Sequence, residues 1–150
     1  MYNPRFFRFL ISVLNYYYRD GDNHICFLIQ GSRKLQSIGK SKCISQYHIL
    51  PSLHAEVACL NNKDFHRMSL KKRRMCSLIV VKLDADGNFR NSRPCFHCME
   101  KIKKSGIKKI MYSTNDGDIE CTFVDHIIEP YISSGWRYRY HDKKNETHSP

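Results

Sequence analysis

The sequence predicts an α/β domain, and three observations lead to that prediction. Apolar residues recur at three- and four-residue steps in some segments and form short unbroken runs in others, as helices and strands do. These segments alternate in the order helix, two strands, helix, strand, helix, two strands, helix. With 150 residues and 41% hydrophobic residues, the chain can bury a core without disulfide bonds. We expect one domain over residues 1–140 and a mobile polar tail over 141–150.

The first third of the chain supplies one helix and two strands. Apolar residues at helical spacing predict an amphipathic helix from Arg5 to Tyr18. The segment Ile25–Ile29 is apolar on both faces and is expected to be a central strand. Lys34–Ile38 alternates polar and apolar residues, which is typical of a half-exposed strand. Residues 39–52 have no regular pattern.

The middle of the chain contains the second helix and the strongest strand signal. The helix is expected to begin at His54, with Ser52 as its N-cap. Residues 61–72 form a polar, basic connection. Cys76–Leu83 is a strand, and the Asp-Ala-Asp-Gly-Asn segment over 84–88 ends it as a turn.

The last third begins with a helix over Pro94–Ser105, closed by Gly106. The remaining segments are, in order, a strand over 107–112, a hairpin turn over 115–118, a strand over 119–124 and a helix over 126–133. Because the turn is so short, the two final strands are expected to be antiparallel; parallel strands need a long crossover.

Two short motifs contain the residues suited to chemistry. His54-Ala55-Glu56 is followed after 37 residues by Pro94-Cys95-Phe96-His97-Cys98. The two cysteines are three residues apart and share one helix face if Pro94 opens a helix. His54 and Glu56 are two apart and diverge by roughly 200° on a helix. Catalytic zinc takes three protein ligands and leaves the fourth position to water. One histidine and two cysteines supply three ligands here, and the carboxylate of Glu56 remains free to act beside the metal.

The pattern His-x-Glu followed by Pro-Cys-x-x-Cys resembles the zinc-dependent cytidine and deoxycytidylate deaminase superfamily of nucleobase deaminases. The resemblance covers about His24 to Val124. It implies a three-layer α/β/α fold, with a five-stranded mixed sheet and helices on both faces. It implies the following roles: His54, Cys95 and Cys98 as ligands of Zn²⁺, Glu56 as the catalytic residue, and Ala55, Arg93 and Tyr112 as substrate contacts. Two of these contacts have alternatives: Tyr112 either stacks on a base or belongs to the core or rim, and Arg93 either meets a phosphate or is a solvated arginine.

The resemblance also implies a reaction. Zinc lowers the pKa of a bound water to about 7, and the oxygen of that water attacks C4 of cytosine. Glu56 takes the proton from the water, protonates the ring nitrogen and helps the amine leave as ammonia. Adenine remains an alternative target, because the same chemistry attacks its C6.

Two other interpretations of the motifs remain open. One is a structural zinc knuckle completed by His97, Cys121 or His126; the other is a coincidence in a chain with seven cysteines. A rival function from a different class is a non-catalytic nucleic-acid-binding protein with structural zinc, which would need a fourth protein ligand.

The net charge of +11 indicates either a phosphate-bearing partner or a compositional bias towards lysine. Basic residues cluster at 71–74, at 101–104, at Lys108 and Lys109, and at Arg137 and Arg139. Polynucleotides and nucleotide substrates both fit such a surface.

The substrate is the open question. The basic clusters favour single-stranded DNA or RNA by a narrow margin, as does the absence of the Asn-x-Glu and Gly-Tyr-Asn-Gly segments of nucleoside and deoxycytidylate deaminases. The antiparallel final strands resemble the branch that acts on free nucleosides, so cytidine, deoxycytidine and dCMP are the alternatives. A second copy of the chain is a further candidate partner.

The setting is expected to be intracellular, either cytoplasmic or nuclear. No apolar run approaches the ~20 residues that cross a bilayer, so no membrane partner is expected. The apolar stretch over 6–18 lacks a small-residue cleavage site. Cys26, Cys59 and Cys76 lie in apolar segments and are expected to be core residues rather than parts of a disulfide framework.

Overall fold

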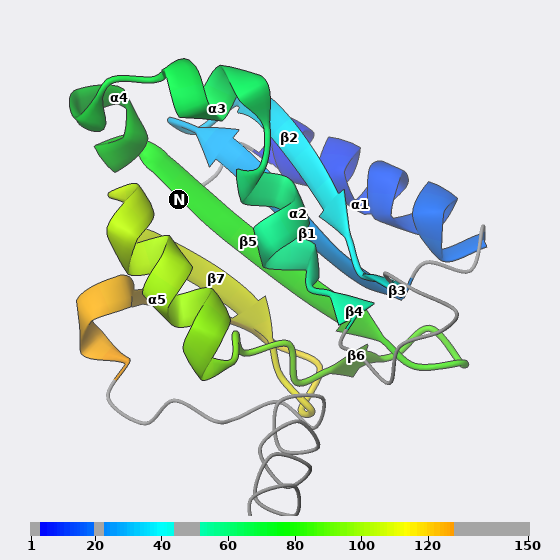
Figure 1. Cartoon of the computed structure of the whole chain (residues 1–150). Coiled ribbons are helices and arrows are strands. Elements are labelled where there is room, and N and C mark those ends of the chain that lie inside the picture. Colours follow the sequence, from blue (N-terminus) through cyan, green and yellow to red (C-terminus); the bar gives the residue numbers. More distant parts are fainter. Residues whose placement is uncertain (1–3, 20–22, 44–51, 128–150) are drawn as a thin grey trace, which may run out of the picture.

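The structure, a computed structural model, describes residues 4–19, 23–43 and 52–127. Its main sheet has the strand order β2-β1-β5-β7-β8, and a short sixth strand, β6, pairs with β5 (Figure 1). The elements are, in chain order, α1 Pro4–Arg19, β1 His24–Gln30, β2 Lys34–Lys40, β3 Lys42–Cys43, β4 Ser52–Leu53, α2 Ala55–Leu60, α3 Lys63–Arg67, α4 Leu70–Arg74, β5 Cys76–Leu83, β6 Phe89–Arg90, α5 Phe96–Ser105, β7 Lys109–Ser113, β8 Ile119–Phe123 and the 3₁₀ helix η1 Val124–His126.

Strand β1 lies between β2 and β5 and is antiparallel to both. All five residues of Ile25–Ile29 are buried, which confirms the predicted central strand. Both edges of β1 are hydrogen-bonded and both faces are covered, so each of these positions requires an apolar side chain.

The sheet is mixed, as predicted. Strands β5 and β7 are parallel neighbours, and α5 forms the crossover between them. Strands β7 and β8 are antiparallel, with Ser113 opposite Ile119, which confirms the hairpin. Gly117 in the turn has φ of +86°, a conformation that side-chain-bearing residues rarely adopt.

Helices cover both faces of the sheet and complete the predicted three layers (Figure 1). Helix α1 covers one face, where Leu10 and Leu14 pack against alternate residues of β1 and β5. Helices α2 and α5 cover the other face, where Cys59 and Ile102 pack on the opposite set of strand residues. Within the described ranges, no helix is long and apolar enough to span a membrane.

The connection between α2 and β5 differs from the prediction. It contains α3 and α4 where we expected only a polar, basic connection. The Asn62 side chain accepts hydrogen bonds from the backbone N–H groups of Asp64 and Phe65, and the Ser69 hydroxyl accepts one from Lys72. Each helix has only five residues, which is too few to show a 3.6-residue period in the sequence. The N-cap residues Asn62 and Ser69 were therefore the only local sign of these helices in the sequence.

The starts of α2 and α5 also differ from the prediction. Ser52 lies in β4, paired with Cys43 of β3, so it is not the N-cap of α2. His54 takes that position, with extended backbone and no side-chain capping bond. Helix α5 begins at Phe96 rather than at Pro94, with Cys95 as its N-cap. The prediction of Gly106 as the residue that ends α5 is confirmed, with φ of +87°.

The remaining predictions concern the C-terminal part of the chain. The expected helix over 126–133 lies mostly outside the described residues, and within them Val124–His126 is a 3₁₀ helix. The tail over 141–150 and the domain boundary at residue 140 also lie outside them.

Gly39 allows α2 to lie directly against β2. A Cβ atom at this position would collide with the carbonyl oxygen of Ala55 and the backbone nitrogen of Cys59. The Ser37 hydroxyl reinforces the contact by donating to the Cys59 carbonyl oxygen at 3.0 Å. Because the colliding atoms belong to the backbone, a side chain at position 39 would displace the helix itself. Gly39 therefore fixes where the first turn of α2 stands.

We expect Gly39→Ala to lower the free energy of unfolding by about 1–3 kcal/mol, the usual cost of overpacking, and to impair metal binding by displacing α2. Chemical denaturation and the zinc content of the purified protein measure the two effects. Gly31→Ala is the control, because its φ of +62° causes backbone strain while no atom lies within 4 Å of the added Cβ. Equal loss of zinc in both variants would argue against a positioning role for Gly39.

Candidate metal centre and its buried carboxylate

The two sequence motifs meet at one end of the sheet, beyond the ends of its inner strands. His54 and Cys95 are the N-cap residues of α2 and α5, and both have extended backbone without a side-chain capping bond. Both helices begin near the carboxyl ends of β5 and β7, where ligand sites of α/β sheets are commonly found. The two side chains are therefore free to face each other instead of capping their own helices.

His54, Cys95 and Cys98 form a compact group of donors. Nδ1 of His54 lies 3.4 Å from Sγ of Cys95 and 3.3 Å from Sγ of Cys98. The three donor atoms all lie within 4.8 Å of one another. Zinc bonds of roughly 2.0–2.1 Å to nitrogen and 2.3 Å to sulfur, at a tetrahedral angle, would separate N and S by about 3.6 Å. The observed spacing therefore suits one metal ion with little rearrangement.

No fourth protein donor joins this group within the described residues. His97, which lies between the cysteines, packs its ring edge-on against Phe96. Cys121 and His126 are exposed, on β8 and η1. Within the described residues, none of these three is placed to complete a structural zinc knuckle.

Glu56 stands beside the donors without being one of them. Its side chain is 1% exposed, and its Oε2 atom has no hydrogen-bond partner in the part of the chain that the structure describes. Burial raises the pKa of this carboxyl to about 7, although its own backbone N–H and the His54 ring act in the opposite direction. A buried carboxylate oxygen without a partner is costly, so this one is placed for a ligand or a reaction rather than for stability.

The pKa values of the two thiols shift in opposite directions. Hydrogen bonds from Cys98 and from His54 lower the pKa of Cys95 to about 4, so Cys95 is a thiolate at neutral pH. The pKa of Cys98 is raised, first because its thiol donates to Cys95 and then because it is buried. A divalent cation between them would favour the thiolate form of both, since coordination deprotonates a thiol.

A buried pair of serines anchors the segment that leads into Cys95. The Ser92 hydroxyl donates to the carbonyl oxygen of Val80 at 2.7 Å and accepts from the backbone N–H of Ser113 at 2.8 Å. The Ser113 hydroxyl lies 2.8 Å from Ser92 Oγ and 3.1 Å from the backbone nitrogen of Lys82, which donates to it. The segment is thus tied to the ends of both β5 and β7.

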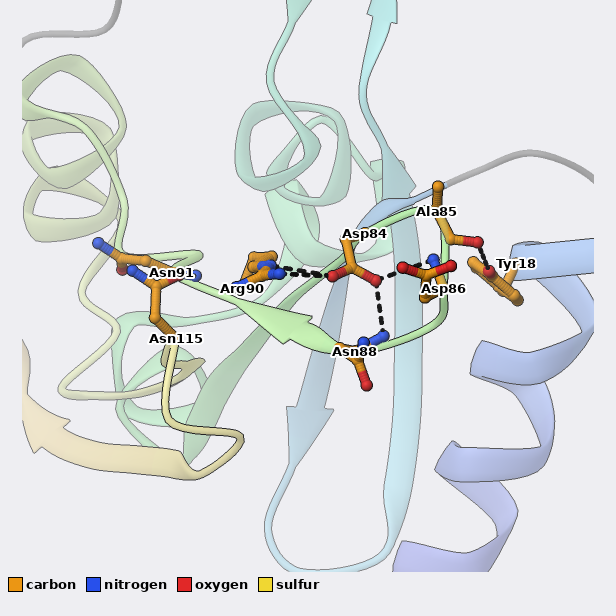
Figure 2. A network of polar contacts seen from close by, with 8 residues as sticks. All are labelled: Tyr18, Asp84, Ala85, Asp86, Asn88, Arg90, Asn91 and Asn115. Carbon is orange, nitrogen blue, oxygen red and sulfur yellow. Dashed lines mark hydrogen bonds and ion pairs between the residues drawn. The ribbon is translucent and has the colours of Figure 1, made fainter.

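Asparagine side chains extend this anchor to the neighbouring turns. Asn115 accepts a hydrogen bond from the backbone N–H of Asn91 at 2.9 Å, and Asn91 in turn accepts one from the N–H of Arg93 at 3.0 Å. Figure 2 shows Asn91 and Asn115 next to each other, and the ion pair of Arg90 with Asp84 beside them. Hydrogen bonds to β5, to the end of β7 and to the turn that contains Asn115 therefore hold the backbone before Pro94.

The predicted substrate contacts have different surroundings. Ala55 is fully buried in the first turn of α2, where backbone N–H groups lack helical acceptors. Arg93 is half-buried and acts electrostatically on Tyr112. Tyr112 is only 8% exposed, packs in the core beneath α2 and α5, and has its hydroxyl hydrogen-bonded to Glu120. That burial favours a core role for Tyr112 over base stacking, which needs an open ring face.

His24 carried no functional signal in the sequence. It opens β1 on the sheet face that α2 and α5 cover, and its Nε2 atom is buried without a hydrogen-bond partner among the described residues. Burial lowers its pKa to about 4, helped by Lys82 and His54 and opposed by Cys95. His24 is thus within electrostatic range of the donors. It lies 30 residues before His54 in a chain with eight histidines, so only the fold could reveal it.

Comparison with known proteins bears on this arrangement. No protein-family model and no curated protein matches the sequence. A crystal structure of cytidine deaminase from Burkholderia pseudomallei is similar, with a TM-score of 0.52 and 14% identity, over 75% of this chain and 84% of that one. This chain has the cytidine deaminase fold. The His–Cys–Cys group fits the zinc-dependent deaminase superfamily that the motifs resemble, and the role of each residue rests on the geometry described above.

The division of roles between the thiols and Glu56 can be tested with two variants. We expect Cys95→Ser to lower both the zinc content and the melting temperature, because the metal links segments 41 residues apart and contributes to folding. We expect Glu56→Ala to leave both nearly unchanged, or to stabilise slightly by removing a buried carboxylate. Elemental analysis and thermal melts measure the contrast. If Glu56→Ala loses as much zinc as Cys95→Ser, Glu56 is a ligand and the division is wrong.

Proposed function

We propose that this protein is a zinc-dependent hydrolase that converts cytosine to uracil. The observation that carries the proposal is a buried carboxylate beside three metal donors, with no fourth donor in the described ranges. A zinc ion held by His54, Cys95 and Cys98 would supply a Lewis acid that makes water reactive at neutral pH. The proton transfers would be the work of Glu56.

Glu56 would act as the proton shuttle. Its free Oε2 atom takes a proton from water, passes it to the ring nitrogen of cytosine, and then assists the amine in leaving. Cytosine and water thus give uracil and ammonia, with no other reactant. A pKa near 7 suits a group that must both accept and return a proton in one turnover. The amide of Ala55, at the start of α2, is available to the carbonyl oxygen of the base.

Single-stranded DNA or RNA is the substrate class that we propose. The net charge of +11 supports a polyanionic substrate. Arg93 supports it further, because it directly precedes the cysteine motif on a firmly anchored segment and could meet a phosphate group.

Free cytidine, deoxycytidine or dCMP is the second candidate. Two observations favour it: the antiparallel pairing of β7 and β8, and the fold shared with a cytidine deaminase. Adenine is a further candidate base, since the pocket shape decides between the two bases.

A non-catalytic, zinc-containing nucleic-acid-binding protein fits less well. A structural zinc site has no use for a carboxyl buried next to it with one oxygen, Oε2 of Glu56, lacking a hydrogen-bond partner among the described residues.

A reducing, intracellular setting belongs to the same proposal. The cysteines with described side chains are all free, and five of them are buried: Cys26, Cys59, Cys76, Cys95 and Cys98.

Turnover should depend on the carboxyl group of Glu56 and not on carboxyl groups elsewhere in the protein. We expect Glu56→Gln to lower kcat/KM by about 10²–10⁴, the usual contribution of a positioned acid–base group. Glu100→Gln is the matched control, because Glu100 is exposed on α5 and differs from Glu56 only in position. Uracil formation on cytidine, deoxycytidine, their monophosphates and single-stranded oligonucleotides, followed by mass spectrometry, measures both variants.

The same panel decides the substrate class. Turnover of free cytidine with none on oligonucleotides would overturn our preference for nucleic acid. Zinc-loaded protein that is inactive on every cytosine-containing substrate would contradict the hydrolase itself.

A further inference from the structure

Two basic runs that are far apart in the sequence meet at the end of α5 opposite the candidate metal centre. Helix α4 lies next to the C-terminal end of α5 (Figure 1), and the two helices and η1 enclose a hollow of about 230 Å³. The residues that line it are Leu70, Arg74, Lys103, Lys104, Gly106, Ile107, Lys108, Val124 and Asp125.

The lining is strongly cationic. Arg74, Lys103, Lys104 and Lys108 are exposed, and none of them forms an ion pair with another residue in the described ranges. Asp125 is the one acidic residue of the lining, so four positive charges face one negative charge. Cations gathered without counter-charges repel one another, and a bound polyanion relieves that repulsion. The hollow is therefore suited to phosphate groups.

The distance to the metal centre restricts what the ligand can be. Helix α5 has ten residues and is about 15 Å long, with Cys95 and Cys98 at its start and Lys103 and Lys104 at its end. A mononucleotide in the hollow could not present its base to the metal centre. A strand with one base per ~3.4 Å covers the distance with about four to five nucleotides.

We propose that this hollow binds the phosphodiester backbone of a single-stranded nucleic acid while a cytosine of the same strand occupies the metal centre. This inference rests on the proposed function and specifies where the polynucleotide runs: along α5. Phe96, 37% exposed on the first turn of α5, offers an aromatic surface on which an intervening base can stack. Glu100 and Lys101 lie between the two ends and balance each other in charge.

The test measures binding on the full-length, zinc-loaded protein. Lys103→Gln with Lys104→Gln removes two cations from exposed helical positions, where glutamine preserves helix propensity. The probe is a fluorescent 12-nucleotide oligothymidylate, observed by fluorescence anisotropy between 50 and 200 mM salt. We expect the slope of log K against log[salt] to become shallower by about 1.4, or ~0.7 for each lost contact to a single strand. The affinity lost over that salt range should therefore be about sevenfold smaller than in the wild type.

The control removes the same charge from the opposite face of the sheet. Arg5→Gln with Arg8→Gln alters α1, which lies on the far side from α5. This variant should retain the wild-type affinity and slope. Equal effects of the two double variants would show that only net charge matters and would overturn the proposal. Displacement of the probe by polyglutamate as effectively as by unlabelled oligothymidylate at equal charge concentration would also overturn it, because the hollow would then accept any polyanion.

Thymidylate contains no cytosine, so this measurement is independent of turnover. If only the Lys103 and Lys104 variant changes the affinity and the salt slope, the result supports nucleic-acid binding at the hollow. That conclusion holds even if no deamination is found. Deamination of free cytidine with wild-type binding by that variant would support the proposed reaction and overturn the proposed path of the strand. On an active protein, the variant should raise KM for a cytosine-containing 12-mer several-fold and leave KM for a cytosine-containing trinucleotide unchanged, because the trinucleotide is too short to reach the hollow.

Discussion

The close approach of α2 to β2 at Gly39 is the contact on which the candidate site depends most. It places the backbone of Ala55 and Cys59 against the strand without an intervening side chain. His54 is thereby brought within 3.4 Å of a thiol 41 residues further along the chain. On the other side, Ser92 and Ser113 tie the approach to Cys95 to the ends of β5 and β7. The donor group is thus preorganised by the packing of backbone on backbone and by buried hydrogen bonds.

The same packing buries acidic groups whose charged forms a metal ion would stabilise. Two thiols and a carboxyl are buried close together, and burial alone disfavours their charged forms. The result is a site in which the pKa of Cys95 is lowered to about 4, that of Cys98 is raised and that of Glu56 is raised to about 7. A divalent cation would favour both thiolates and leave the carboxylate as the group that exchanges protons. Stability and chemistry are therefore coupled in this site, because the same ion that organises it would also make water reactive.

The central strand, the antiparallel final strands and the motifs could be predicted because they depend on local patterns, and the three layers followed from the family resemblance of those motifs. The apolar run of β1, the short turn before β8 and the Cys-x-x-Cys spacing are all visible in a few consecutive residues. What the sequence did not reveal arises from contacts between distant segments. The need for Gly39, the position of His24 and the burial of Tyr112 follow from how α2 and α5 pack on the sheet. Helices α3 and α4 were missed because five residues are too few for a period, and the basic hollow because its cations lie about 30 residues apart in the chain.

The central claim is that three protein donors bind zinc and leave one coordination position open beside Glu56. X-ray absorption spectroscopy of the zinc-loaded full chain measures this coordination shell directly. The account predicts two sulfur atoms at about 2.3 Å and two lighter atoms at about 2.0–2.1 Å, of which only one belongs to an imidazole. The imidazole signal should disappear in His54→Ala. A third sulfur, or a second imidazole, would mean that the shell is closed by protein and would contradict the account.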